Sequence, residues 1–218
     1  MLKFAEEWFN LEAKQQEIEN EKLTSELRFL KAQINPHFLF NTLNNLYYLA
    51  FTQSPNTTEV IAKLSQMMRY MIYESNHPKV LLSREIEYME NYISLEKLRL
   101  NDQIPIAFEV LGDPNRVQIA PLVLITFLEN AFKHGVGNNF SGAWIALKIE
   151  IEDSKSQTPK IIYTVKNSKL PNGNNLEKSG IGLQNVQRRL ELSYPDHYRL
   201  DVTDEKEFYE VKLEIDYQ

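Results

Sequence analysis

The spacing of apolar residues divides the chain into a helical first part and a second part that mixes strands and helices. Residues 5–34 contain no proline or glycine, and their apolar residues fall at the alternating spacings of a heptad seam. Gln16 and Asn20 occupy two seam positions, which weakens a coiled coil but fixes its register. The pattern predicts a coiled-coil signalling helix over residues 1–34 that pairs in parallel with a second copy. An amphipathic helix packed on its own chain is the alternative.

Three further helices are predicted between residues 35 and 100. The first follows Pro36, and its apolar stripe consists of Leu39, Leu43, Leu46 and Ala50. The second follows the turn-forming SPNTT run, and its broad apolar face consists of Val60, Ile61, Leu64, Met67, Met68, Met71 and Ile72. Ser83 is expected to cap the third, which runs to about Leu100 as a bridge between domains. The first two would form a helical hairpin that dimerises, so residues 35–100 are the predicted helical dimerisation domain.

Residues 101–218 combine alternating strand patterns with two helical patterns. An apolar helix is expected from Pro121 to Gly135, and another helix after Gly182. Strands are expected in the segments IPIAFEVL, AWIALKIEI, KIIYTV, YRLDVTD and FYEVKLEID, of which the last two form a terminal hairpin. The fold of this part is therefore predicted to be α+β.

Composition removes several classes of function. The absence of cysteine excludes disulfides, thiolate metal sites and cysteine catalysis. The net charge of −6, with lysine and arginine dispersed among acidic residues, argues against a nucleic-acid surface. No window approaches the roughly 20 apolar residues of a membrane-spanning helix, so the chain as given is expected to be soluble.

The run QINPHFLFNTLN at 33–44 holds the first candidate for chemistry. In a helix, His37, Asn41 and Asn44 fall on one face, and Asn41 lies one turn after the histidine. This spacing suits a nucleophilic imidazole on a rigid element. A single histidine on an amphipathic helix is more often a surface or core residue, so this run alone does not decide.

Two distant runs add to it: LENAFKHG at 128–135 and GIGLQNVQRRL at 180–190. In this order, the three runs resemble the LytS/YehU-type sensor histidine kinases, and the resemblance extends from about Leu27 to Ile215. It implies a phosphoacceptor box around His37, followed over residues 101–218 by a GHKL-type ATP-binding domain, in which helices cover one face of a mixed sheet. The second and third runs are then its N box and its glycine-rich G box.

The resemblance also implies the roles of single residues. Asn130 would bind Mg²⁺, whose preference for oxygen ligands suits an amide. Gly180, Gly182 and Leu183 would lie at the ATP phosphates, as would Lys133 and His134, unless these two only complement the dipole of their helix end. The family's adenine-binding aspartate is replaced in the run VKNSK by Asn167, whose oxygen still accepts a hydrogen bond but carries no charge.

The expected activity is ATP-dependent autophosphorylation of His37, followed by phosphotransfer to an aspartate of a response regulator. Asn41 could orient the imidazole, or Glu129 could act as the base. The expected cofactors are ATP and Mg²⁺, and the expected assembly is a homodimer attached to the membrane only through an upstream sensor region. The chain would then be a cytoplasmic fragment. The alternatives are a dimeric signalling scaffold that binds ATP without efficient autophosphorylation, and a GHKL ATPase in which His37 is structural.

Overall fold

The computed structural model describes residues 12, 14–16, 18, 36–136, 142–152, 159–169 and 181–217, without the side chains of Pro36, His37, Ile181 and Gly182. The predicted coiled coil over residues 1–34 and the predicted phosphate contact Gly180 lie outside this part, apart from five residues of the former. The chain forms two compact units, Met1–Asn44 and Asn45–Gln218.

Helix α2 spans Pro36–Phe51, as predicted, and begins with a proline, which has no amide hydrogen to leave unbonded in a first turn. Its buried residues differ from the predicted stripe: Phe38 and Thr42 are buried, whereas Leu43 and Ala50 are exposed. Burial of Thr42 is tolerated because its hydroxyl donates to the Phe38 carbonyl at 2.9 Å. Apolar spacing defined a stripe here but not the face that is covered.

Helix α3, Thr57–Arg69, continues directly into a π turn, η1, Tyr70–Glu74. Val60, Leu64 and Met67 are buried as predicted. Ile61, Met68 and Ile72 of the predicted face are exposed, and Met71 is half-buried. The apolar face is therefore narrower than the sequence indicated, and the π turn was not predicted.

Helix α4, Leu82–Arg99, packs against α3. The predicted cap is wrong: Leu81 is the N-cap residue, no side chain caps the helix, and Ser83 lies inside it. The start of α4 is instead fixed by a two-stranded sheet, in which β1, Val80–Leu81, pairs antiparallel with β3, Gln118–Ile119. The amide of Leu82 also donates to the Val117 carbonyl at 2.8 Å.

The main sheet has five strands in the order β2-β4-β5-β7-β6. Its first pair is parallel and the others are antiparallel, so the sheet is mixed. The strands are β2, Ile106–Leu111; β4, Ile145–Glu152; β5, Lys160–Ser168; β6, Tyr198–Asp204; and β7, Phe208–Asp216. Pairing of β6 with β7 confirms the predicted terminal hairpin, and the predicted α+β fold is confirmed.

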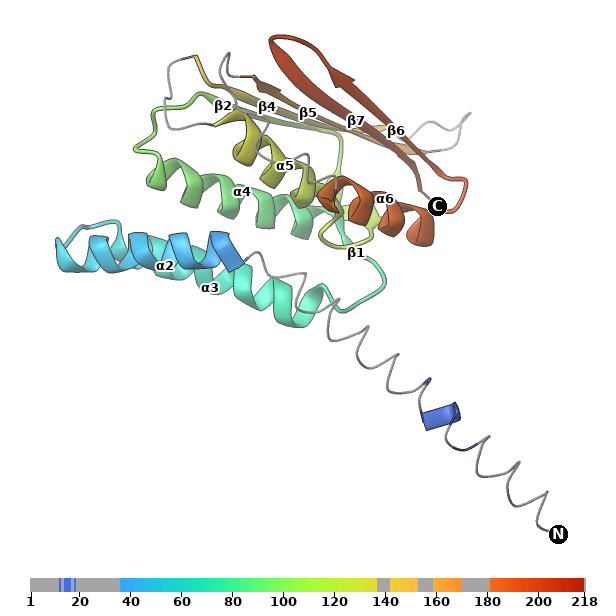
Figure 1. The fold of residues 1–218 in the computed structure, drawn as a ribbon, viewed down its shortest axis with the longest axis horizontal. Helices are drawn as coiled ribbons and strands as arrows, with labels where there is room; N and C mark the ends of the chain where they lie inside the picture. Colours follow the sequence, from blue (N-terminus) through green and yellow to red (C-terminus); the bar gives the residue numbers. More distant parts are fainter. Residues whose placement is uncertain are drawn as a thin grey trace. The chain divides into compact units, whose positions relative to one another are not determined.

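Helices lie on one face of this sheet (Figure 1). Helix α5, Val123–Gly135, packs on β4 and β5, and it contacts both α4 and α6, Ile181–Ser193. A short 3-10 turn, η2, Pro114–Arg116, precedes β3. Helix α5 starts two residues after the predicted Pro121, because Leu122 has a left-handed backbone with φ 58°. No helix in the described ranges is long and apolar enough to cross a membrane.

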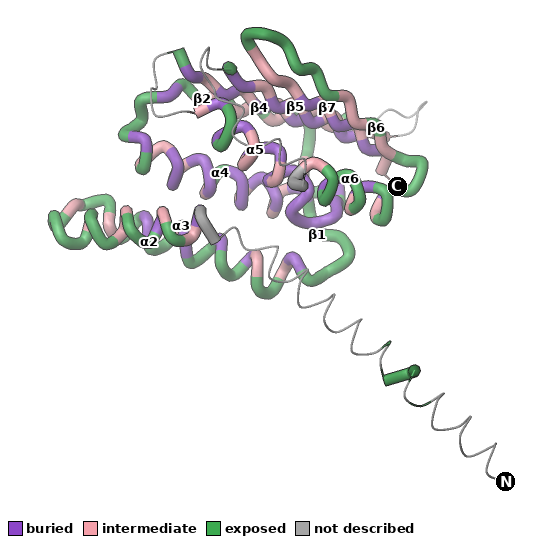
Figure 2. Tube along the Cα trace, in the orientation of Figure 1, coloured by how far each residue is buried: buried purple, intermediate pink, exposed green. Residues whose placement is uncertain are grey.

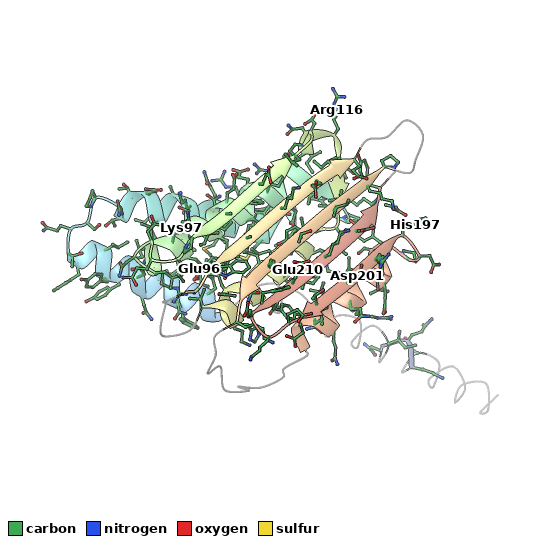
Figure 3. All side chains as sticks on the ribbon, turned by 90° about the horizontal axis from the view of Figure 1, so that it is seen from above. Glu96, Lys97, Arg116, His197, Asp201 and Glu210 are labelled. Atoms are coloured by element: carbon green, nitrogen blue, oxygen red, sulfur yellow. The ribbon has the colours of Figure 1, made fainter. Side chains whose placement is uncertain are left out.

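The core lies between the sheet and these helices. Alternate residues of the central strands are buried there, among them Ile149, Tyr163 and Leu213, and the buried residues continue along α4 and α5 (Figure 2). The opposite face carries charged side chains, including Asp201 of β6 and Glu210 of β7 (Figure 3). Lys166 and Glu210 pair across β5 and β7 at 3.1 Å. One face of the sheet therefore holds the helices, and the other faces solvent.

Candidate functional site

Helix α5 carries all of the N-box residues, 128–135. Leu124, Phe127, Leu128 and Ala131 are buried and fix the helix to the sheet. Glu129 and Asn130 are half-buried, whereas Lys133 and His134 are exposed in the last turn. The apolar face thus anchors the helix and leaves the polar residues at its side and at its C-terminal end.

Asn167 lies near the end of β5 and is completely buried. Its Nδ2 donates to the Ser168 carbonyl at 2.9 Å, but its Oδ1 has no hydrogen-bond partner among the described residues. A buried acceptor without a donor costs about 1–3 kcal/mol. A ligand that donates a hydrogen bond at this point would remove that penalty, and the amino group of adenine is such a donor.

Gly135 brings the end of α5 against Asn167. A Cβ added to this glycine would lie 2.8 Å from the Asn167 Nδ2 and 2.9 Å from its Cβ. Helix α5 ends at Gly135 as predicted, Val136 is the C-cap, and the φ of Gly135 is not positive, so the glycine is not required for a left-handed cap. A side chain is excluded here because two elements approach closely. The structure therefore brings Asn167 and the N-box helix together.

Ser168 ties this corner to the start of β4. The Trp144 amide donates to the Ser168 Oγ at 3.0 Å, and the Ser168 amide donates to the Trp144 carbonyl at 3.1 Å. Sequence reasoning missed both residues, although the alternating pattern of β4 and β5 predicted the two strands. Strand patterns do not reveal a hydrogen bond between a side chain and the backbone of a neighbouring strand.

Glu129 lies close to α4. Burial raises the pKa of Tyr88 and of Tyr92, and the negative charge of Glu129 adds to both shifts. The Tyr92 ring also meets the Phe132 ring edge-on, with 5.4 Å between the centroids. Two tyrosines of α4 thus belong to the surroundings of the predicted base, which the N-box pattern alone could not indicate.

The charges at the end of α5 are unequal. Partial burial lowers the pKa of His134, and the positive charge of Lys133 lowers it further. Both effects favour the neutral form of the His134 imidazole. A lysine near a helix C-terminus complements the helix dipole, and it remains exposed for contact with an anion.

Asn130 is the only predicted metal ligand. Its side-chain amide has no hydrogen-bond partner within the part of the chain that the structure describes. The same part holds no group of three or more histidine, aspartate or glutamate residues placed to bind a metal ion. Mg²⁺ at Asn130 would thus complete its shell with phosphate oxygens and water, which suits its usual coordination.

The predicted helix after the G-box glycines is present as α6. Gly182 lies in its first turn, Leu183 is half-buried, and Val186 and Leu190 are buried. The phosphate contacts assigned to Gly180, Gly182 and Leu183 stay predictions.

His37 and Asn41 both lie on α2, one turn apart, and Asn41 is half-buried. They belong to the unit Met1–Asn44, whereas the nucleotide-site candidates belong to Asn45–Gln218. Within the second unit, the structure brings Asn167 close to the end of the N-box helix. His77 and His197, to which no role was assigned, are exposed.

Comparison with known proteins points in one direction. Residues 25–104 match the histidine kinase family. Sensor protein kinase HptS of Staphylococcus aureus strains USA300 and NCTC 8325 is 28% identical over 184 residues, which is 81% of this chain and 35% of HptS. The chain thus spans about a third of the length of these curated relatives. These matches support a sensor histidine kinase.

Solved structures of histidine kinases are also similar at low identity. The catalytic domain of ThkA matches with a TM-score of 0.43 and 21% identity, covering 64% of this chain and 94% of that domain. The Acinetobacter baumannii kinase AdeS matches with a TM-score of 0.43 and 13% identity, covering 90% of this chain and 98% of that chain.

Proposed function

We propose that this chain is the kinase region of a sensor histidine kinase, in which ATP phosphorylates His37 and the phosphoryl group then passes to an aspartate of a response regulator. The observation that carries the proposal is the buried, unpartnered Oδ1 of Asn167 beside the end of the N-box helix. It supplies one acceptor for a base at the position where the resemblance expects adenine.

In this proposal each candidate has a separate task. A neutral nitrogen of His37 attacks the γ-phosphorus, a nitrogen–phosphorus bond forms, and ADP leaves as the phosphorus–oxygen bond breaks. The ring proton is then lost to a base, for which Glu129 is the candidate, while Asn41 orients the ring. Asn130 would hold Mg²⁺, which offsets charge on the phosphates when bound. Lys133 adds a further positive charge.

The proposed organisation follows the predicted domains. Residues 1–34 form a signalling helix, residues 35–100 the dimerisation and phosphoacceptor domain, and residues 101–218 the ATP-binding domain. Sensor histidine kinases typically dimerise and act on response regulators. We propose the same for this chain, with a membrane-spanning sensor region upstream of it.

Incubation with Mg²⁺ and γ-labelled ATP tests the proposal. The wild type should acquire label that is acid-labile and alkali-stable, as a phosphohistidine is, and His37→Gln should acquire none. His77→Gln is the matched control, because His77 is exposed and has no assigned role. Equal labelling of wild type and His37→Gln would overturn the proposal.

The second candidate is a dimeric scaffold that binds ATP without efficient autophosphorylation. The neutral Asn167 favours it, since an uncharged acceptor makes a weaker hydrogen bond than a carboxylate. ATP binding without label on the wild type would support this candidate. ATP hydrolysis that persists without phosphoprotein would instead support the GHKL ATPase.

A further inference from the structure

Glu85 is a carboxylate of α4 that is completely buried and contacts two other elements. Its Oε1 accepts a hydrogen bond from the Tyr70 hydroxyl of η1 and another from the Leu122 amide, the latter at 2.7 Å. Its Oε2 has no partner among the described residues. Burial of an acid group with one unpartnered oxygen lowers the stability of the fold. The resemblance to sensor histidine kinases assigned no role to Glu85.

The contact with Leu122 sets the start of the N-box helix. Leu122 has φ 58°, which is unfavourable for a residue with a Cβ and persists only where the surroundings fix it. Its amide is the donor to Glu85, and α5 begins at the next residue. The carboxylate therefore lies at the positive end of the helix dipole, where a negative charge is favoured.

Groups from several elements face Glu85. Tyr70 of η1 and Leu122 bond to it, and the pKa values of Tyr88 in α4 and Tyr163 in β5 are raised by burial and by its charge. Burial lowers the pKa of Arg189 in α6 and raises that of Tyr194, which follows α6, and the charge of Glu85 acts to raise both values. The Tyr194 hydroxyl accepts in turn from the Ala120 amide, just before Leu122. The G-box helix thus reaches the same buried centre.

We propose that Glu85 is a positioning residue for the nucleotide site, because its carboxylate ties the π turn that ends α3 to the first turn of the helix that carries Asn130. The inference rests on the proposed function and deepens it. Asn130 lies two turns further along the same helix. If the first turn of α5 is less well fixed, the side chain of Asn130 is displaced from its position at the nucleotide site. Loss of the hydrogen bonds between Glu85, Tyr70 and Leu122 should therefore weaken the binding of Mg²⁺–ATP, although none of these residues touches the nucleotide.

Ionisation gives the tie a pH dependence. Burial raises the pKa of Glu85 to about 7, although the bonds from Leu122 and Tyr70 and the charge of Arg189 oppose this. The charge at the start of α5 is lost when the carboxyl is protonated. ATP affinity in the wild type is therefore expected to fall as pH decreases through 7, beyond any change shared by all variants.

Three variants test the proposal by the Kd for Mg²⁺–ATP between pH 6 and pH 8. Glu85→Gln should weaken binding at pH 8 by roughly 5-fold or more, a typical coupling between sites, and should flatten the pH profile relative to wild type. Tyr70→Phe should weaken Mg²⁺–ATP binding by less than Glu85→Gln does, because it removes only one of the two hydrogen bonds to Glu85. Glu96→Gln is the matched control, because Glu96 is also buried on α4 but pairs with Arg99 of its own helix at 2.5 Å, and its Kd should match wild type.

Thermal unfolding separates positioning from a loss of fold. Glu85→Gln removes an unfavourable buried charge at pH 8, so its Tm should equal or exceed that of wild type while its ATP affinity is reduced. Unchanged affinity and an unchanged pH profile in Glu85→Gln would overturn the proposal. So would a Kd that rises only in proportion to a fall in Tm.

Hydrogen exchange keeps this test separate from the proposed function. A wild type that binds no ATP would contradict the proposed function itself. The amides of residues 122–126 then still decide about Glu85: faster exchange in Glu85→Gln than in Glu96→Gln supports the tie. Equal exchange in these two variants and in the wild type overturns it.

Discussion

The unpartnered oxygen of Asn167 makes a specific prediction at the scale of one residue. Asn167→Leu keeps the approximate volume but removes the acceptor, so ATP affinity should fall by about 10-fold or more, the effect of one buried hydrogen bond. Stability should change little, because the lost bond to the Ser168 carbonyl is offset by removal of an unsatisfied polar atom. Calorimetric titration with Mg²⁺–ATP and thermal unfolding measure the two effects. Unchanged affinity would show that no ligand bonds to this oxygen.

Glu85 predicts how stability depends on pH. Its pKa is raised from 4.5 to about 7 on folding, so between these values the folded chain holds a proton that the unfolded chain has lost. The unfolding free energy should therefore decrease as pH rises from 5 to 8, by on the order of 3 kcal/mol from this residue. Urea unfolding of wild type and Glu85→Gln at both values measures it. The slope should be much smaller in Glu85→Gln, and identical slopes would contradict the assignment.

At the scale of elements, the contact of α5 with β5 depends on Gly135. In a helix end with free space, Gly135→Ala would raise stability by about 0.5–1 kcal/mol through helix propensity. The close approach of Asn167 predicts the opposite sign, a loss of about 1–3 kcal/mol from overpacking. Urea unfolding decides between the two signs. Adding Asn167→Ala to Gly135→Ala removes the clashing Nδ2 and Cγ atoms but leaves the Cβ, so it should recover only part of the loss.

Some elements were predictable to the residue, and the reason is physical. Strands β6 and β7 match the predicted segments because their alternation and the charged residues between them reflect a sheet with one solvated face. The start of α4 was not predictable, since pairing of β1 with a strand from beyond β2 decides it. Likewise, the π turn and the left-handed Leu122 depend on tertiary contacts.

The candidate site shows the same division. The N-box and G-box runs indicated the correct helices, because helix periodicity and glycine positions are local signals. Gly135 and Trp144 are far in sequence from Asn167 and Ser168. Their contacts therefore become visible only in the three-dimensional structure. The tie at Glu85 was missed for this reason too.

At the scale of the whole molecule, the exposed apolar residues of α2 bear on assembly. Tyr47 and Phe51 are 73% and 77% exposed, and their rings stack with 6.4 Å between the centroids. The proposed homodimer would cover such a surface, which is unusual for a monomer. The double variant Tyr47→Lys, Phe51→Lys should therefore shift sedimentation from dimer to monomer. Arg199→Ala is the control, because the Arg199 side chain is 72% exposed and lies on β6 rather than on α2, and this variant should remain dimeric.

Division of the candidates between two compact units has a consequence for the reaction. His37 and Asn41 belong to one unit, and Glu129, Asn130 and Asn167 belong to the other. The proposed function therefore assigns nucleotide binding and phosphoacceptance to different units. We expect His37→Gln to bind Mg²⁺–ATP with the wild-type Kd although it acquires no label, and a large change in its Kd would contradict this separation.

The backbone of Trp144 is hydrogen-bonded to Ser168, which follows Asn167 in β5. The chain has one other tryptophan, Trp8. An indole emits with an intensity and wavelength set by its immediate surroundings. In a Trp8→Phe background, Trp144 is the single remaining tryptophan, and its backbone is hydrogen-bonded to Ser168, the residue after the proposed adenine contact. The protein thus carries its own optical probe, and titration with unlabelled nucleotide should change its emission without any attached dye.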